Sequence, residues 1–263
     1  MLIIQEAKMA KIIANIYTTK YIGSQEIAHA FFEILKEANL LPDKIGLYEP
    51  IKTKFSLDKA IEFWTLQEDG CYEEGKGYVG KYGSMIGKKT KPSFLFTMTW
   101  LLCPKGNLNY ITFFVSPTVY KKHKEAIEIV FKETFILFDG IYGNITHEDP
   151  KERQHVAGSL ETRMPGIFWC NYFGKKYIDF LGENQILSAP WFKVEKIEDK
   201  VLIGYLDESP LSQEILENDF LANNIKAHLG LDSFGDPEEE RWNEAQGNYD
   251  VYQVKNVPKL FDS

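Results

Sequence analysis

Two strongly apolar segments joined by a short turn constrain this fold more than any other feature. Residues 93–102 and 108–115 are rich in aromatic and β-branched side chains, which favour strands. The residues between them, 103–107, carry the proline, glycine and asparagine that are typical of turns. The sequence therefore predicts an antiparallel hairpin. The nearly apolar run 94–103 is too short for a membrane-spanning helix, which needs about 20 residues.

Strand and helix signals alternate along the rest of the chain. Runs of β-branched and aromatic residues predict further strands at 11–18, 44–48, 141–146, 166–173, 192–197 and 201–206. Serine caps predict helices that begin after Ser24, Ser56, Ser116 and Ser209, and a short helix is predicted at 175–181. This mixture predicts an α+β fold with a mixed, mainly antiparallel sheet and helices packed on it. We expect a single domain over 1–263, whose element order also admits two related βα halves, 10–146 and 164–263.

A glycine-rich stretch, Gly75–Gly80, matches the pattern GxGxxG. A dinucleotide site requires this pattern between a strand and a helix, with the helix N-terminus facing the phosphates. Here Glu73 and Glu74 precede the pattern, and no helical periodicity follows it. The stretch is therefore interpreted as a mobile loop or an edge strand, and no cofactor is expected.

The cysteines and the N-terminus bear on the cellular compartment. Cys71, Cys103 and Cys170 are scattered, and their odd number favours neither a disulfide framework nor a cysteine-based zinc site. Two of them lie in apolar runs and are expected to be small core residues. The apolar stretch at residues 1–4 is too short for a signal peptide. A reduced, cytoplasmic protein is the resulting expectation.

A polar connector, residues 147–163, holds the densest group of titratable side chains. His147, Asp149 and His155 lie within nine residues of one another. Such a set suits general acid–base chemistry, or a metal held by two imidazoles and a carboxylate. A solvated connector explains the same residues without chemistry, and it is the favoured interpretation. No catalytic residue and no metal ligand is therefore assigned.

Charge is distributed unevenly along the chain. Residues 1–131 hold 17 Lys and Arg against 14 Asp and Glu, whereas residues 132–263 hold 13 against 24. Within 207–250, twelve acids face only two bases. Such a surface repels a phosphate backbone, so nucleic acid is not an expected partner. It would attract a basic protein and accelerate its encounter, although a solvated acidic face that keeps the chain soluble explains the same pattern.

The block from Arg163 to Trp191 is the most distinctive part of the sequence. It reads RMPGIFWCNYFGKKYIDFLG and continues into ILSAPW. This block resembles bacterial immunity proteins of polymorphic toxin systems, particularly families associated with type VI secretion. The hairpin and helix pattern of 194–210 fits the same arrangement. The resemblance covers about 29 residues well, does not extend to the N-terminal half, and carries no catalytic residues.

The resemblance implies an α+β protein that binds and neutralises a toxin without catalysis. Many antibacterial toxins are basic nucleases, and an acidic inhibitor face can imitate nucleic acid. The expected partner-binding residues are acids of the C-terminal region with Trp242 as an aromatic anchor: Asp236, Glu238, Glu239, Glu240, Trp242 and Glu244. Tyr249 is a further candidate anchor.

Two other hypotheses remain open from the sequence. A small enzyme would use the 147–163 segment, and it requires His147, Asp149 and His155 to converge on one pocket. A structural or regulatory homodimer would pair through an edge strand or an aromatic patch. The expected partner is a protein, and no membrane partner is expected.

Overall fold

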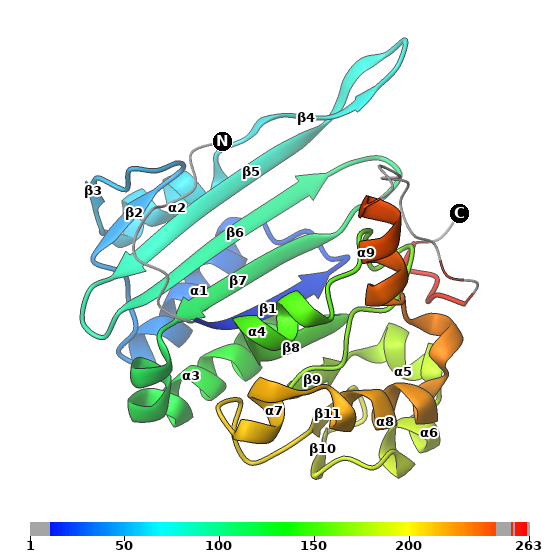
Figure 1. Cartoon of the computed structure of the whole chain (residues 1–263). Helices are drawn as coiled ribbons and strands as arrows, with labels where there is room; N and C mark the ends of the chain where they lie inside the picture. Colours follow the sequence, from blue (N-terminus) through cyan, green and yellow to red (C-terminus); the bar gives the residue numbers. More distant parts are fainter. Residues whose placement is uncertain (1–10, 246–253, 255, 262–263) are drawn as a thin grey trace.

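One antiparallel sheet organises the chain. The computed structural model describes residues 11–245, 254 and 256–261. The described strands follow the order β10-β11-β9-β8-β1-β7-β6-β5-β2-β3, with β4 beside β5, and all these neighbours pair antiparallel (Figure 1). The strands are β1 Ile12–Thr18, β2 Lys44–Gly46, β3 Thr53–Lys54, β4 Glu68–Glu73, β5 Gly77–Lys89, β6 Phe94–Leu102, β7 Asn109–Val115, β8 Tyr142–His147, β9 Cys170–Phe173, β10 Lys193–Ile197 and β11 Val201–Tyr205. The predicted α+β class and the predicted 93–115 hairpin are confirmed.

The helices begin largely where the serine caps predict. Ser24, Ser56 and Ser116 each accept a hydrogen bond from the backbone N–H three residues further on, which satisfies a donor that the first helical turn leaves free. The helices are α1 Gln25–Glu37, α2 Leu57–Thr65, α3 Pro117–Leu137, α4 Glu148–Arg153, α5 Lys175–Leu181, α6 Glu183–Ser188, α7 Gln213–Glu217, α8 Phe220–Leu229 and α9 Pro237–Ala245, with a 3₁₀ turn η1 at Leu231–Ser233.

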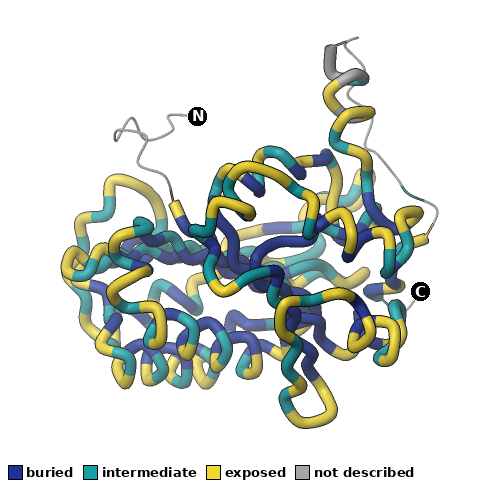
Figure 2. The backbone as a smooth tube through the Cα atoms, turned by 60° about the horizontal axis from the view of Figure 1, so that its bottom comes forward, coloured by how far each residue is buried: buried dark blue, intermediate teal, exposed yellow. Residues whose placement is uncertain are grey.

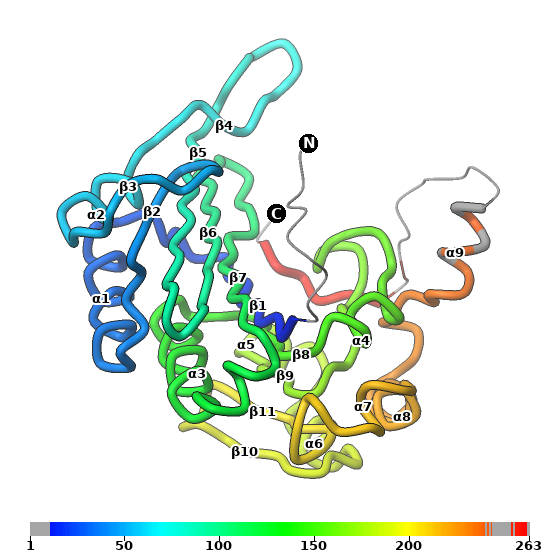
Figure 3. Tube along the Cα trace, turned by 60° about the vertical axis from the view of Figure 1, so that its left-hand side comes forward, coloured from blue at the N-terminus to red at the C-terminus, as the bar shows by residue number. Residues whose placement is uncertain are grey.

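The two faces of the sheet are covered differently. On one face, α1, α2 and α3 pack an aromatic core, in which the Phe31 ring lies 5.1 Å from Trp64 and the Phe131 ring 4.9 Å from Tyr172. On the other face, α5 covers the β8–β9 end, where Tyr177 lies 5.3 Å from Tyr142. Figure 2 shows the buried residues concentrated along the sheet. Figure 3 shows α1 and α2 on one side of β5–β7 and α9 on the other.

Glycines in β5 make room for aromatic side chains of β6. Trp100 is fully buried, and its ring lies where a Cβ on Gly83 would approach within 2.2 Å and a Cβ on Gly23 within 2.4 Å. Gly87 accommodates Phe96 in the same way, at 2.3 Å. Residues 77–80 pair only with β4, as an edge strand does. The interpretation of this glycine-rich region as a mobile loop or edge strand is wrong for residues 81–89, which pair with β6 and, at 81–82 and 86–88, also with β4 or β2 on the other side. The glycines of this strand provide close packing.

We expect Gly83→Ala to lower the free energy of unfolding by about 2 kcal/mol, because the added methyl overpacks a fixed indole. The Trp100 ring has little freedom to move, since its Nε1 donates to the carbonyl oxygen of Trp64 at 2.9 Å. Urea unfolding measures the effect. Ser84→Ala is the control, because Ser84 is the next residue of β5 and is only half-buried on the opposite face. It should change the value by less than about 0.5 kcal/mol, and equal values for the two variants would contradict the packing argument.

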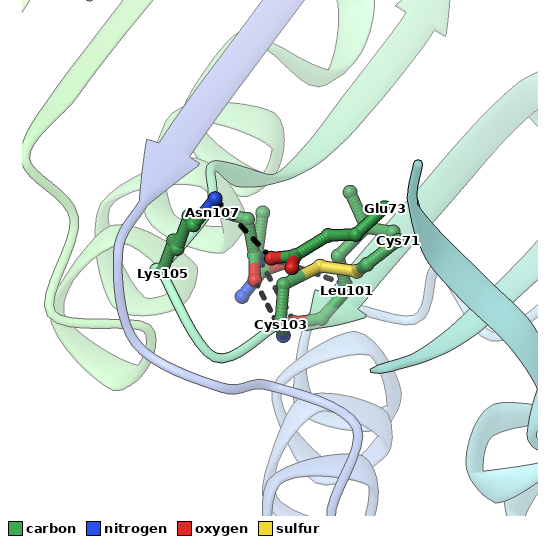
Figure 4. Close-up of a disulfide and its surroundings, with 7 residues drawn as sticks. Cys71, Glu73, Leu101, Cys103, Lys105 and Asn107 are labelled. Atoms are coloured by element: carbon green, nitrogen blue, oxygen red, sulfur yellow. Dashed lines mark hydrogen bonds and ion pairs between the residues drawn. A yellow bond between two sulfur atoms is a disulfide. The ribbon is translucent and has the colours of Figure 1, made fainter. Parts of the chain in front are cut away.

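Two of the three cysteines form a disulfide, which corrects the expectation of unpaired cysteines. Cys71 and Cys103 are bonded, with their Cα atoms 5.9 Å apart (Figure 4). The bond passes over Gly80 of β5, where a Cβ would lie 2.8 Å from the Cys71 sulfur and 2.4 Å from the Leu102 carbonyl oxygen. Cys170 is free and buried, as expected of a core residue. The pairing depends on the register of β4, β5 and β6, so the spacing of the cysteines along the chain does not reveal it.

Candidate functional site

The predicted acidic surface begins at helix α9. Asp236 accepts a hydrogen bond from the Glu238 N–H at 2.9 Å and so caps the start of the helix. The exposed side chain of Glu238 pairs with Arg241, whose guanidinium also donates to the Arg153 carbonyl oxygen at 3.4 Å. We call Asp236, Glu238 and Glu239 the α9 acidic surface, because all three are exposed. In Figure 3 the helix lies at the edge of the molecule, apart from the sheet.

The other predicted contact residues cannot be placed in the same way. The side chains of Glu240, Trp242 and Glu244 lie outside the described residues, although their backbone belongs to α9. Tyr249 also lies outside the described residues. Three of the six predicted partner-binding side chains are therefore located, and they share one exposed helix start.

The histidines of the 147–163 segment have different surroundings. His147 is buried at the start of α4, where its Nδ1 accepts the Asp149 N–H at 3.3 Å and lies 3.3 Å from the Asp149 carboxylate. His155 is exposed beyond the end of α4, and no hydrogen bond or ion pair of its imidazole is found among the described residues. The first imidazole therefore acts as a helix cap. The three side chains do not form the common pocket that the enzyme hypothesis requires.

Arg153 is the centre of a polar hub that joins α4 to α7 and α8. Its guanidinium donates to the carbonyl oxygens of Ile215, Leu216 and Asn218 at 2.9, 2.6 and 3.1 Å. It also forms a salt bridge with Asp219 at 3.1 Å. The helix predicted to run from Ser209 to Leu229 is wrong as one element, because it is interrupted at residues 218–219, between α7 and α8. Arg153 satisfies carbonyl oxygens at this interruption.

The side chains of Gln154 and Asn171 satisfy the backbone groups of Ile167 and Phe168 as a neighbouring strand would. The Gln154 amide donates to the Ile167 carbonyl oxygen at 2.8 Å and accepts the Ile167 N–H at 3.1 Å. Asn171 does the same for Phe168, at 2.7 and 3.0 Å. Buried backbone groups need such partners. The predicted strand 166–173 is restricted to Cys170–Phe173. The favoured interpretation of a solvated connector is wrong for His147 and Gln154, which are both buried.

Lys226 lies buried below the acidic surface and was not singled out from the sequence. It is only 6% exposed, and its ammonium lies 5.9 Å from the centre of the Phe234 ring. Burial lowers its pKa to about 8, while the carboxylates of Asp219 and Asp236 act in the opposite direction. Among the described residues its ammonium has no hydrogen bond and no ion pair. The buried α8 positions Ala222, Ile225 and Leu229 recur at helical spacing, and Lys226 lies on that stripe.

Hollows in this region are small. One lies between Gln154, Ile167 and Asp219, another is lined by Arg163, Lys226 and Phe234, and neither has room for more than about one water molecule. Small-molecule sites commonly measure about 300–1,000 Å³. In the part of the chain that the structure describes, no group of three or more His, Cys, Asp or Glu side chains is arranged to hold a metal ion. None of the described helices combines the length and apolarity needed to span a membrane.

Comparison with known proteins concerns the fold. No family model matches the sequence, and no curated protein matches it either. Among solved structures, the Pseudomonas aeruginosa T6SS protein PA0821 superposes with a TM-score of 0.52 over 96% of this chain and 92% of its own. The two chains share a fold. Their identity is 12%, so the likeness extends to the arrangement of elements and not to particular site residues.

Proposed function

We propose that the chain is an immunity-type protein that binds and neutralises a bacterial toxin, without catalysis, through the α9 acidic surface. The observation that carries the proposal is the exposure of Asp236, Glu238 and Glu239 together at one helix start. The fold shared with a T6SS protein supports a role in such a secretion system, where toxins and their inhibitors are paired. The resemblance of residues 163–210 to immunity families points in the same direction.

The charge of this region favours a basic protein as the partner. Residues 207–250 contain twelve acids and two bases, and one of those bases, Lys226, is buried. Arg241 is engaged by Glu238. Complementary charge accelerates association and weakens the complex as salt is raised. An anionic surface of this kind also disfavours nucleic acid and anionic lipid as ligands.

The disulfide indicates the kind of cellular compartment in which the two proteins meet. Disulfides persist in oxidising compartments and are rare in the reducing cytosol. The Cys71–Cys103 bond therefore favours an oxidising compartment over the cytoplasmic location expected from the sequence. We propose that the toxin is met there, and we assign no reaction to it.

We expect Glu238→Lys/Glu239→Lys to weaken binding to the purified product of the adjacent reading frame by at least about 10-fold at 50 mM salt. The reversed charges repel a basic partner and slow its encounter. Calorimetric titration at 50 and 200 mM salt measures the dissociation constant. Coexpression of both proteins, with growth as the readout, measures neutralisation.

Glu33→Lys/Glu37→Lys is the matched control. These exposed residues lie on α1, across the sheet from α9, and their reversal changes the net charge equally, from −8 to −4. If both double variants weaken binding equally, net charge rather than the α9 acidic surface drives the association. If the unmodified protein neither binds nor protects, the immunity proposal is wrong.

A further inference from the structure

The hairpin formed by β4 and β5 extends beyond the rest of the sheet. In β5, residues 81–89 pair with β6, whereas the outer part, 77–80, pairs only with β4. Figures 1 and 3 both show this hairpin projecting from the body of the molecule. We call residues 68–82 the tyrosine arm.

Two exposed tyrosines face each other near the end of the arm. Tyr72 and Tyr78 are directly opposed in the β4–β5 register, and their rings meet edge to face at 5.7 Å and 76°. Their exposed fractions are 68% and 65%. Tyrosine presents a large, rigid contact area at low entropic cost, and it is enriched among residues that dominate protein interfaces. A pair held in fixed geometry at the end of a narrow hairpin therefore has the features of a binding element.

The arm is held in place along its length by a disulfide and ion pairs. The Cys71–Cys103 disulfide joins β4 to the turn after β6. Glu73 of the arm pairs with Lys105 of the same turn at 3.3 Å, and Asp69 pairs with Lys81 across the arm at 2.9 Å. Figure 4 shows the disulfide beside Glu73 and Lys105. A two-stranded hairpin alone is marginally stable in water. These bonds fix the arm before it meets a partner, which reduces the entropy lost on binding.

We propose that the tyrosine arm inserts into a cleft of the toxin partner, with Tyr72 and Tyr78 against its apolar wall. This inference rests on the proposed function and names a second contact surface for it. The arm is only two strands wide, so it is narrow enough to enter a cleft, and both rings lie on one face of the arm, where one wall of the cleft can contact them. Residues 68–82 hold four acids against two lysines, and this excess of negative charge favours the cationic rim of a basic protein over anionic lipid or nucleic acid. Glu73 is paired with Lys76 and Lys105, so Glu74 is the carboxylate beside the rings that can face the partner.

The test compares Tyr72→Ala/Tyr78→Ala with Phe220→Ala. Phe220 is 64% exposed on α8, away from the arm, and serves as the matched aromatic control. Binding to the purified product of the adjacent reading frame is measured by calorimetry. We expect the double variant to weaken binding by at least about 30-fold and the control by less than about 3-fold. Circular dichroism establishes that each variant is folded.

A second measurement tests the role of the disulfide in the same complex. We expect dithiothreitol to weaken binding by the unmodified protein about 5- to 10-fold, because the freed arm must be ordered on binding. Cys71→Ala/Cys103→Ala should bind like the reduced protein and should not respond to dithiothreitol. Unchanged affinity on reduction would contradict the claim that the disulfide preorganises the arm.

The outcomes separate this inference from the proposed function. If the α9 reversal weakens binding and the tyrosine variant does not, the immunity proposal stands and the arm inference is overturned. If no complex forms with the unmodified protein, both are overturned. If light scattering shows a dimer that Tyr72→Ala/Tyr78→Ala converts to a monomer, the arm contacts a second copy of this chain, which also overturns the inference.

Discussion

Lys226→Met should raise the free energy of unfolding at pH 7 by about 3 kcal/mol. The pKa of this lysine falls from 10.5 to about 8 in the folded protein, and each unit corresponds to about 1.4 kcal/mol. Methionine has a similar length and no charge, so it keeps the packing of the stem against Phe234 while removing the cost of burying an ammonium. The carboxylates of Asp219 and Asp236 reduce that cost but do not cancel it.

The difference in free energy of unfolding between Lys226→Met and the unmodified protein should disappear at alkaline pH. The unfolded lysine keeps its proton up to about pH 10.5, whereas the folded one loses it near pH 8. Between these values the unfolded state binds more protons, so the stability of the unmodified protein rises with pH relative to the variant. Below pH 8 the full difference is present, and above pH 10.5 both states are neutral and it vanishes. Urea unfolding of both proteins at pH 7, 9 and 10.5 measures this.

Lys200→Met is the control for the general effect of removing a positive charge. Lys200 is exposed in the turn between β10 and β11, so its replacement should change the free energy of unfolding by less than about 0.5 kcal/mol. A loss of stability in Lys226→Met at pH 7 would mean that attraction to Asp219 and Asp236 exceeds the cost of burial, contrary to our expectation.

The elements that the sequence predicts well depend on neighbouring residues. Ser24, Ser56 and Ser116 cap their helices through backbone groups three residues away, and the 93–115 hairpin is set by its own turn. Elements that depend on distant residues are predicted less well. The break between α7 and α8 is made by Arg153, more than sixty residues earlier in the chain. The central position of residues 81–89 in the sheet depends on pairing with β6, whose Trp100 and Phe96 pack onto Gly83 and Gly87.

The residues of the candidate site also differ in whether the sequence alone can identify them. The acidity of residues 236–239 is a property of composition, so it can be read directly from the sequence. The tyrosine arm cannot be, because Tyr72 and Tyr78 become a pair only through the β4–β5 register. The burial of Lys226 is indicated in the sequence by its position on the apolar stripe of α8. Its burial, however, depends on contact with the segment around Phe234.

Loss of the Cys71–Cys103 bond should lower the free energy of unfolding by about 3–4 kcal/mol. The two residues are 32 apart in sequence, and a cross-link that closes a loop of this length restricts the unfolded chain by about that amount. Urea unfolding of the unmodified protein with and without dithiothreitol measures the difference. Cys71→Ala/Cys103→Ala should match the reduced protein, and dithiothreitol should leave the variant unchanged, since Cys170 is free and buried.

Hydrogen exchange distinguishes a loss of global stability from release of the tyrosine arm. The core hydrogen bonds of β1, β7 and β8 involve neither cysteine, so their exchange should accelerate only as far as the global stability falls. Residues 68–80 should exchange faster than that, because in the reduced protein they are held by β4–β5 pairing, the exposed ion pairs of Asp69 and Glu73, and an exposed hydrogen bond from Tyr48 to Glu68. Uniform acceleration throughout the sheet would show that the disulfide stabilises the fold without fixing the arm, and preorganisation of Tyr72 and Tyr78 would then lose its physical basis.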